Sequence, residues 1–298
     1  MKMRNFSLMC VSVLLASCAD NSGKQYWEDN NDTAVVMTRV AAFDGNGQTL
    51  DGENDVTDMQ ACLFEGGIMT KVYDNLQTSG DAYRLQVDSR VGNLYMLANA
   101  ADAVDLNRLQ GEGISEAEWL KHIYKAEDSG RTRPFFTGVL ALDASGQNGN
   151  AQILTLKRGV ARFDVTMNVA GTVRLENFTL TNVARSAYLF SQGEVKSPAD
   201  AVRRDTTVTF SSALTKDTPG VLYVYEQENA GMEIKIEVSF DGGEVKTLTK
   251  TLDAALRRNA VYTVTVSKDH IDIIVKPVFE EWEPGGNIEL TPSSHMLP

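Results

Sequence analysis

The sequence has few of the residues on which most enzymes and disulfide-stabilised domains depend. Its 298 residues include only three cysteines and three histidines. Cys10 lies in an N-terminal signal-like segment and Cys18 would be acylated, so Cys62 would be the one free cysteine of the mature chain and no internal disulfide could form. Cys62 lies in an apolar stretch typical of a strand, which predicts a small buried core residue and not a nucleophile.

The histidines do not form a catalytic or metal-binding pattern. His122 falls in a predicted helix and His295 in a polar tail, whereas His270 stands two residues before Asp272 on a predicted strand. Two ligands do not make a metal site, so exposed strand residues are the favoured interpretation of this pair. There is also no Gly-x-Ser-x-Gly nucleophile motif and no phosphate-binding loop. We therefore predict no enzymatic activity, no metal and no cofactor; an extracellular hydrolase is the weakest alternative.

Basic residues and long apolar runs are scarce too. The chain has 28 basic and 40 acidic residues, and loss of Lys2 and Arg4 with a signal peptide would leave 26 against 40, a net charge of −14. Such an acidic surface argues against binding to nucleic acid or to anionic lipid. No later apolar run approaches the roughly 20 residues that span a bilayer. A covalent lipid is therefore the only membrane anchor that the sequence predicts.

The N-terminus predicts a lipoprotein signal peptide over residues 1–17. Basic residues begin it, an apolar stretch runs to Leu15, and Ala16-Ser17-Cys18 completes a lipobox. Cleavage before Cys18 would leave a cysteine that can be acylated. Residues 18–33 are rich in Asp, Asn, Ser and Gly, a composition that predicts a flexible tether.

Alternation of apolar and polar residues is the main structural signal. It is clearest over 161–169, 232–240 and 262–266, and it indicates a sheet with one face on a core. Asp241-Gly242-Gly243 predicts a hairpin turn. Weaker strand candidates span 34–43, 56–65, 82–88, 93–98, 135–142, 151–158, 173–181, 206–210, 221–226, 244–252 and 270–279.

Helices are fewer. Ser115 and Glu118 form a capping box, and an apolar helical face follows it, made of Trp119, Leu120, Ile123 and Tyr124. A second helix is predicted over 100–109, and a short third one from Ser197-Pro198.

Around a dozen strands without a βαβ rhythm predict an all-β fold with minor α content, built from antiparallel β-sandwiches. The turn-rich stretch 143–150 is the predicted boundary between an N-terminal domain, 34–150, and a C-terminal domain, 151–298.

Two binding hypotheses stay open. Residues 44–55 carry oxygen ligands at alternate positions, as calcium loops do, but Thr49 stands where an EF-hand needs glycine and Asp55 where it needs a bidentate glutamate. A solvated loop is favoured over weak calcium binding. A glycan-binding surface would need exposed aromatic residues, for which Trp27, Trp119 and Trp282 are candidates, although Trp119 has a predicted core role on its helix.

Several segments, in order and spacing, resemble the fimbrillin family of Bacteroidales, the subunits of protease-assembled type V pili. They are Leu94-Tyr95-Met96-Leu97-Ala98-Asn99, Arg133-Pro134-Phe135-Phe136-Thr137-Gly138, Leu154-Thr155-Leu156-Lys157-Arg158-Gly159-Val160-Ala161-Arg162-Phe163-Asp164-Val165, Tyr223-Val224-Tyr225-Glu226, Leu256-Arg257-Arg258-Asn259-Ala260-Val261-Tyr262-Thr263-Val264 and Trp282. Departures are Phe136-Thr137 in the second segment and Arg162 in place of the usual lysine. The family's anchor branch commonly carries a cysteine soon after the lipidated one, whereas the next here is Cys62, which disfavours an anchor role.

The resemblance implies two transthyretin-like β-sandwich domains and a structural subunit of a cell-surface fimbria. It implies export as an outer-membrane lipoprotein lipidated at Cys18, and other fimbrial subunits as partners, with host or bacterial surface ligands left open. It also implies that an arginine-specific protease removes the first strand, for which Arg39 is the candidate site. The donated strand would come from Ile271, Ile273 and Val275, or from the tail with Ile288 and Leu290. The alternative function is a surface glycan-binding or adhesin lipoprotein of β-sandwich type.

Overall fold

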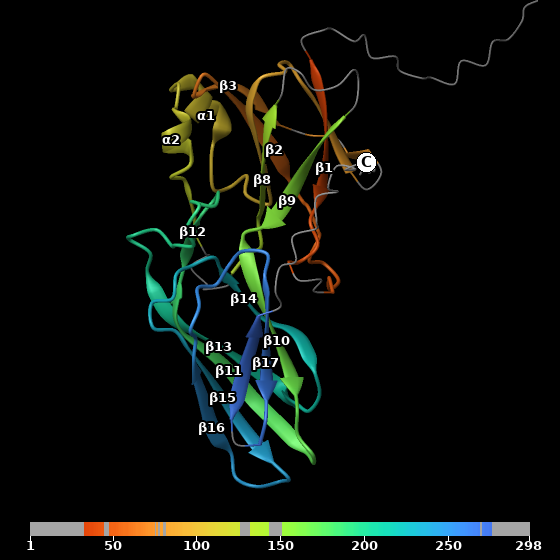
Figure 1. The fold of residues 1–298 in the computed structure, drawn as a ribbon, viewed down its shortest axis with the longest axis vertical. Helices are drawn as coiled ribbons and strands as arrows, with labels where there is room; N and C mark the ends of the chain where they lie inside the picture. Colours follow the sequence, from red (N-terminus) through yellow and green to blue (C-terminus); the bar gives the residue numbers. More distant parts are fainter. Residues whose placement is uncertain are drawn as a thin grey trace, which may run out of the picture. The chain divides into compact units, whose positions relative to one another are not determined.

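The computed structural model describes residues 33–44, 48–74, 76, 78–79, 82–125, 132–142, 151–268 and 270–275 (Figure 1). Strands dominate these residues and helices are few, which confirms the predicted all-β class. None of the helices formed by the described residues is long and apolar enough to cross a membrane. The predicted signal peptide, Cys18 and all but the last residue of the predicted tether lie outside the described residues.

The first half of the described chain builds one eight-stranded sheet, in the order β3-β2-β6-β8-β9-β1-β5-β4. Its strands are β1 (Ala34–Val40), β2 (Met59–Glu65), β3 (Ile68–Tyr73), β4 (Thr78–Ser79), β5 (Ala82–Val87), β6 (Gly92–Ala98), β8 (Phe136–Leu142) and β9 (Gln152–Arg158).

The two halves of this sheet enclose a single core, because apolar residues from β2, β6 and β8 pack against those from β1, β5 and β9. We call this set the N-terminal core. Its buried members are Val36, Met59, Ala61, Leu63, Leu85, Val87, Leu94, Met96, Ala98, Phe136, Leu142, Leu154 and Leu156.

The second half forms two four-stranded sheets, in the orders β14-β10-β17-β18 and β13-β11-β15-β16. Their strands are β10 (Val160–Met167), β11 (Val173–Ala184), β13 (Arg203–Leu214), β14 (Thr218–Tyr225), β15 (Glu233–Phe240), β16 (Lys246–Thr251), β17 (Val261–Val266) and β18 (Ile271–Val275).

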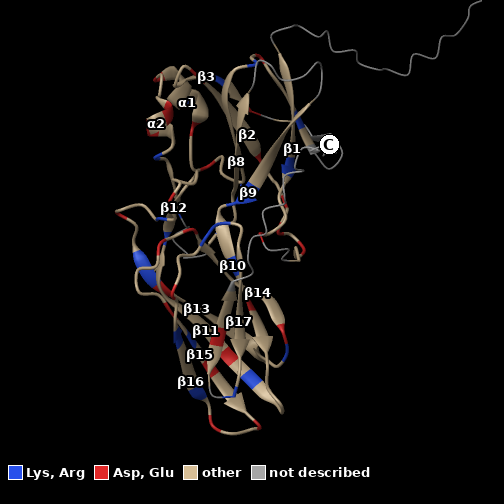
Figure 2. Cartoon of the chain, in the orientation of Figure 1, with Lys and Arg blue, Asp and Glu red and all other residues tan. Residues whose placement is uncertain are grey.

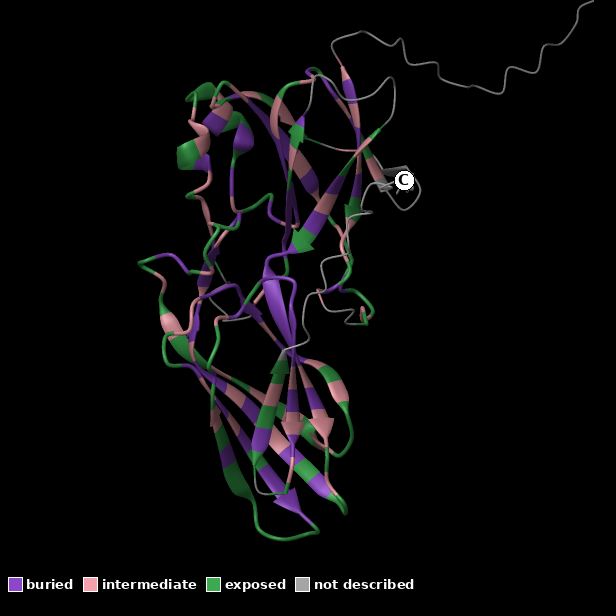
Figure 3. Ribbon diagram, viewed as in Figure 1, coloured by how far each residue is buried: buried purple, intermediate pink, exposed green. Residues whose placement is uncertain are grey.

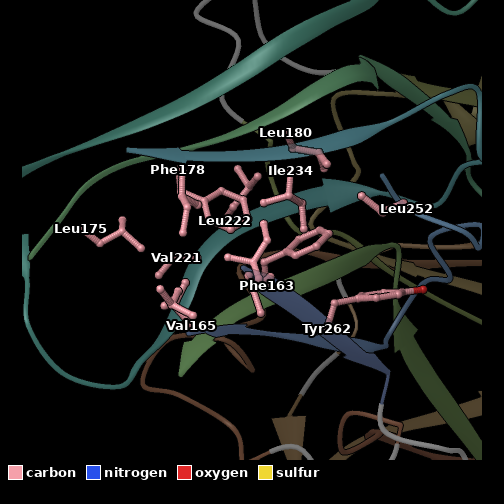
Figure 4. Packing of buried hydrophobic residues seen from close by; sticks show 14 of the residues in the cluster. Phe163, Val165, Leu175, Phe178, Leu180, Val221, Leu222, Ile234, Leu252 and Tyr262 are labelled. Atoms are coloured by element: carbon pink, nitrogen blue, oxygen red, sulfur yellow. The ribbon is translucent and has the colours of Figure 1, made fainter. Parts of the chain in front are cut away.

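These two sheets form a sandwich around the C-terminal core, which Figure 4 shows in close-up. Phe163 of β10 lies at its centre. Its ring centroid is 5.8 Å from that of Phe178 in the opposite sheet and 5.3 Å from that of Tyr262 in the neighbouring strand. Buried residues alternate with more exposed ones along the strands of this sandwich (Figure 3). The strands expected from the alternation over 161–169, 232–240 and 262–266 are thus confirmed as β10, β15 and β17.

A third cluster, rich in aromatic residues, lies beneath the helices α1 (Leu106–Gly111) and α2 (Glu116–Trp119). Trp119 is fully buried there, and its ring centroid is 6.2 Å from those of Phe64 and Tyr95. The capping box at Ser115 is present, as predicted. The helix behind it is shorter than predicted, because Ile123 and Tyr124 belong to strand β7 (Ile123–Lys125), which pairs with β12 (Ser186–Tyr188).

The other two predicted helices need correction. Residues 100–105 form turns and extended chain, and α1 begins only at Leu106, where the Asp105 side chain accepts the N–H of Arg108. Pro198 begins no helix; its carbonyl accepts the N–H of Ala201 in a turn. Each of the two segments has a residue that favours the start of a helix. Too few apolar residues follow it at helical spacing to stabilise the helix that was predicted.

Two strand pairings differ from the predicted antiparallel arrangement. β1 pairs with β9, and β10 with β17, in parallel. Parallel neighbours need long crossover connections, and such distant partners cannot be recognised from local alternation. The transthyretin-like topology expected from the resemblance stays a prediction.

Two turns were predicted between strands. Asp241 and Gly242 have φ values of +52° and +74°, and the N–H of Gly243 donates to the carbonyl of Phe240, so the turn between the antiparallel strands β15 and β16 is confirmed. Residues 143–150 lie outside the described residues. β9, which follows them, pairs with β1 and β8, whereas β10 belongs to a sheet of the C-terminal sandwich. We therefore propose Gly159, between β9 and β10, as the dividing point of the two sandwich domains.

Candidate functional site

β1 lies in the interior of the eight-stranded sheet although it is the first strand of the described chain. It runs parallel to β9, from Val36 opposite Gln152 to Val40 opposite Leu156. On its other side it runs antiparallel to β5, where Thr38 lies opposite Tyr83. We call the space that β1 occupies between β5 and β9 the slot.

The sequence of β1 explains why it forms a strand here. Ala34, Val36 and Thr38 face inward and are at most 9% exposed, and the residues between them point away from the core. The Thr38 hydroxyl donates to the Met96 sulfur at 3.1 Å, so the one buried polar side chain of β1 has a partner. Burying Val36 alone contributes about 1.5–3 kcal/mol.

β1 provides most of the backbone pairing of both neighbouring strands. Apart from β1, β5 pairs with the two-residue strand β4, and β9 pairs with β8 at two positions. Loss of β1 would therefore leave two long strand edges and the apolar side chains of the N-terminal core facing an open slot. Unpaired edges of this kind accept another strand readily.

Arg39 lies at the exposed end of β1. Its side chain is open to solvent, and its Nε donates to Thr155 Oγ1 at 3.4 Å. The register with β5 ends at Thr38, so beyond that residue the registered pairs of β1 are with β9. Arg39 is thus an accessible side chain at the second-last residue of β1, and its role as a protease site stays a prediction.

The chain after Arg39 is held by two buried arginines that extend from β9 and β10. Together with their partners they form what we call the joint cluster: Phe43, Glu53, Arg158, Arg162, Tyr223 and Asn259.

Arg158 is 1% exposed and lies over the ring of Phe43, with 4.1 Å between the guanidinium carbon and the ring centroid. Its Nη1 donates to the carbonyl of Ala41 at 2.8 Å and to Asn259 Oδ1 at 2.9 Å, and its Nε donates to the carbonyl of Glu53. Burial lowers the pKa of Arg158, although nearby Glu53 counteracts this. The side chain therefore ties residues on both sides of the 44–50 stretch to the end of β9.

Arg162 is 2% exposed and forms the centre of the charge network. Its Nη1 donates to both carboxylate oxygens of Glu53, at 2.9 and 3.1 Å, and its Nε donates to Asp164 at 2.8 Å. Burial alone would lower the pKa of Arg162, but the hydrogen bonds that it donates to Asp164 and Glu53 raise it above its ordinary value. The Tyr223 hydroxyl also donates to Glu53, at 2.7 Å, and burial together with this carboxylate raises the pKa of Tyr223.

Asn259 closes the joint cluster from the start of β17. Its φ of +59° is a left-handed conformation that asparagine tolerates better than most residues. Its Nδ2 donates to the carbonyl of Ala42 at 2.8 Å and to Asp44 Oδ1 at 3.0 Å. Chain segments far apart in sequence are thereby held together by fully paired polar groups.

Residues 48, 51–52 and 54–55 are exposed, in keeping with the predicted solvated loop, and Glu53 is the exception to it. Glu53 is 8% exposed, and its carboxylate is engaged by Arg162, Tyr223 and the N–H of Leu50. It therefore serves a salt bridge inside the protein. Residues 45–47, which the calcium hypothesis also needs, lie outside the described residues.

A second buried ion pair lies nearby. Arg258 Nε donates to Glu226 Oε2 at 2.8 Å, and its Nη1 donates to Thr137 Oγ1 at 3.2 Å. The segments that carry the family resemblance therefore meet in space: Arg258 and Asn259, Tyr223 and Glu226, Arg158 and Arg162, and Thr137 all contribute to these two networks. Sequence reasoning used these residues only as marks of resemblance and gave them no structural role.

The predicted donor residues are only partly described. Ile271 and Ile273 lie in β18, which pairs antiparallel with β17, and Ile271 is 2% exposed in the C-terminal core. Val275 ends the same strand, and Ile288 and Leu290 lie outside the described residues, as does Cys18.

Other candidate residues have ordinary structural roles. Cys62 is fully buried in β2, as predicted, and burial raises its pKa. His270 Nε2 lies 3.2 Å from Asp272 in an exposed pair. Trp119 is fully buried and cannot serve as a surface platform for glycans, and Trp27 and Trp282 lie outside the described residues. Charged residues of both signs are spread along the strands of the C-terminal sandwich (Figure 2).

Comparison with known proteins supplies the remaining findings. The family model of the fimbrillin-A associated anchor proteins Mfa1 and Mfa2 matches residues 28–285. The fold is similar to that of the tip fimbrial protein Mfa3 from Porphyromonas gingivalis with C-terminal truncation, at 13% identity over 81% of this chain and 98% of that chain, with a TM-score of 0.54. It is also similar to a candidate cell adhesion protein from Bacteroides eggerthii, at 14% identity over 82% and 95% of the two chains, with a TM-score of 0.52. No curated protein sequence matches the chain.

Proposed function

Because the chain belongs to the family of the fimbrillin-A associated anchor proteins Mfa1 and Mfa2, we propose that it is a fimbrial subunit exported as a lipoprotein and assembled by protease-triggered strand exchange. Membership confirms the resemblance predicted from the segments between Leu94 and Trp282. The family gives the chain a structural role in a fimbria at the cell surface, with other fimbrial subunits as partners, and it is not a family of known enzymes.

One observation carries the strand-exchange part of the proposal. β1 is the main pairing partner of both β5 and β9, and Arg39 at its end is exposed. Cleavage after Arg39 would free all of β1 except its last residue, Val40, and a strand from another subunit could then restore both the backbone pairs and the N-terminal core. A polymer built in this way is held by the same interactions as a folded domain.

The lipid has a different role before and after such a cut. Acylation of Cys18 would hold the precursor at the outer membrane. Cleavage after Arg39 would remove the lipid together with β1, so the anchor would serve for delivery and not for permanent attachment.

For the donated strand we propose the tail containing Ile288 and Leu290. β18 has five registered pairs with β17, and its residue Ile271 is buried in the C-terminal core. Donating Ile271, Ile273 and Val275 would therefore open the core of the donor itself, at a cost in the free energy of folding.

The experiment uses the lipid-free chain from Ala19 onward, treated with an arginine-specific protease. We expect a new N-terminus at Val40 and SDS-resistant ladders on gels. The variant Arg39→Lys keeps the charge and should resist this protease, yet trypsin should cut it and restore the ladders. Arg108→Lys, an exposed arginine in α1, is the matched control and should behave as the parent chain.

Truncation after Val275 removes the proposed donor and should abolish ladders without preventing the cut. Polymers that persist in uncut Arg39→Lys would contradict the cleavage site, and polymers formed by the truncated chain would return the donor role to β18. Cleavage at Val40 with no polymer under any condition would contradict strand exchange.

A further inference from the structure

We propose that residues 41–44 and 48–54 form a clasp, which the joint cluster holds in place so that cleavage after Arg39 releases the strand residues up to Arg39 and nothing beyond them. This inference rests on the proposed function, because it concerns what stays folded once the first strand leaves. It assigns a role to Glu53, Arg158 and Arg162 as positioning residues for strand release.

The clasp begins at Ala41, the second residue after the proposed cut, behind Val40. The N–H of Ala41 donates to the carbonyl of Leu156 at 2.8 Å, and the N–H of Asp44 donates to the carbonyl of Asn259 at 2.9 Å. Phe43 is 2% exposed between these two bonds. The guanidinium carbons of Arg158 and Arg162 lie 4.1 and 4.6 Å from its ring centroid, which is the stacked geometry of a cation–π contact.

The far end of the clasp is held by charge. Glu53 accepts from Arg162 and Tyr223, and its Oε2 also accepts the N–H of Leu50 at 2.5 Å. The Arg158 side chain donates to the Glu53 carbonyl and to the Asn54 side chain. A buried carboxylate between such donors is expensive to release, because Arg162 would keep only Asp164 as a counter-charge and Arg158 would lose the nearby charge of Glu53.

The bonds of the clasp are separate from those of β1. The inward side chains of β1 contact the N-terminal core, whereas the clasp is bonded to the end of β9, to β10, to β14 and to Asn259. Removing residues 34–39 would therefore break none of these side-chain hydrogen bonds of the clasp. The end of the slot next to residues 41–44 would therefore stay fixed when β1 leaves. An incoming strand would meet an acceptor that is already ordered at that end.

Hydrogen–deuterium exchange tests this in two arms. In the intact chain, Glu53→Gln keeps the side-chain volume but removes the charge, and it should speed exchange at Asp44 and at residues 48–54 by at least about tenfold, the effect of weakening bonds to charged groups. Asp51→Asn, the same change at an exposed carboxylate two residues away, is the matched control and should leave exchange unaltered. Tyr223→Phe gives a milder second variant in case Glu53→Gln folds poorly.

In the second arm, the parent chain is cut after Arg39 and measured again. We expect residues 48–54 to keep the protection that they have in the intact chain, while β5 and β9 lose theirs. Protection at β15 should be the same in all variants, which separates a local effect from general unfolding.

Two results would overturn the clasp: loss of protection over 48–54 when the parent chain is cut, or equal exchange in Glu53→Gln and Asp51→Asn. Failure of the protease to cut after Arg39 would instead count against the proposed function, and the intact-chain arm would still decide the clasp.

Discussion

Arg258 and Glu226 form an ion pair in which neither side chain is more than a tenth exposed. Arg258 also donates to Thr137 and to the carbonyl of Leu189, so its remaining N–H groups are used by different parts of the chain. The removal of either member would leave the other buried without a counter-charge. Such pairs add little to stability over an apolar alternative, but breaking them is costly.

We therefore expect Glu226→Gln to lower the free energy of unfolding by about 3–5 kcal/mol. Glu176→Gln removes a partner from an exposed pair with Arg174, where the charged atoms are 3.6 Å apart, and should cost less than about 1 kcal/mol. Urea denaturation of both variants measures the difference. Equal losses of stability would mean that the buried pair has no special role.

At the scale of the element, β1 combines strong packing with small inward side chains. Val36 is fully buried and Val35 on the opposite side of the strand is half-buried. The inward side chains therefore set how firmly β1 is held before and after a cut at Arg39.

Val36→Ala should lower the free energy of unfolding of the intact chain by roughly 1–3 kcal/mol, because it leaves a space in the N-terminal core. It should also speed the departure of β1 after cleavage. Val35→Ala is the control and should have a smaller effect on both. Thermal unfolding measures the first quantity, and native mass spectrometry of the cut chain follows the loss of the N-terminal peptide. A slower departure of β1 in Val36→Ala than in Val35→Ala would contradict this.

The local alternation of apolar and polar residues predicted those strands that have one buried face and one exposed face. β10, β15 and β17 alternate cleanly because one face lies on the C-terminal core. β7 was assigned to a helix because Ile123 and Tyr124 fit helical spacing as well as a strand, and short apolar runs do not distinguish the two. Its pairing with β12, some 60 residues along the chain, decides the outcome.

The residues of the candidate site also divide into those that the local sequence predicts and those that only the fold brings together. The place of Arg39 near the end of a strand could be predicted because an apolar strand precedes it in the local sequence, whereas its role as a protease site stays a prediction. The joint cluster could not, because Glu53 and Arg162 are 109 positions apart and no local pattern links them. A signal was present in part, since Arg158, Tyr223 and Asn259 stood in segments that resembled the family, but only the fold shows that these segments meet.

At the scale of the whole molecule, tyrosines contribute to the N-terminal core, the C-terminal core, the aromatic cluster beneath the helices and the joint cluster. The chain has nine tyrosines. In several of them burial is the largest cause of a raised pKa, namely Tyr73, Tyr95, Tyr124, Tyr223, Tyr225 and Tyr262.

These tyrosines predict a loss of stability in alkali. In the unfolded chain a phenol ionises near its ordinary pKa of about 10, whereas the buried phenols stay protonated to higher pH. Their stabilisation is thus complete below about pH 10 and is lost as the pH rises through their raised pKa values. Urea midpoints between about pH 8 and pH 11 should fall at the upper end. The tyrosinate absorbance of the native chain should lag behind that of the chain in denaturant, and coincident titrations would contradict the prediction.

The slot has one property that concerns the symmetry of an assembled fibre. β1 runs antiparallel to β5 and parallel to β9, so the two walls of the slot run in opposite directions. A donated strand could lie in the slot in either of two orientations. In each it would run parallel to one of β5 and β9 and antiparallel to the other, so the number of parallel and antiparallel pairings does not distinguish the two orientations. The inward positions now filled by Ala34, Val36 and Thr38 differ in size and polarity and can do so. If strand exchange occurs as proposed, the head-to-tail polarity of the filament would thus depend on the shape of the spaces that these three side chains leave in the acceptor.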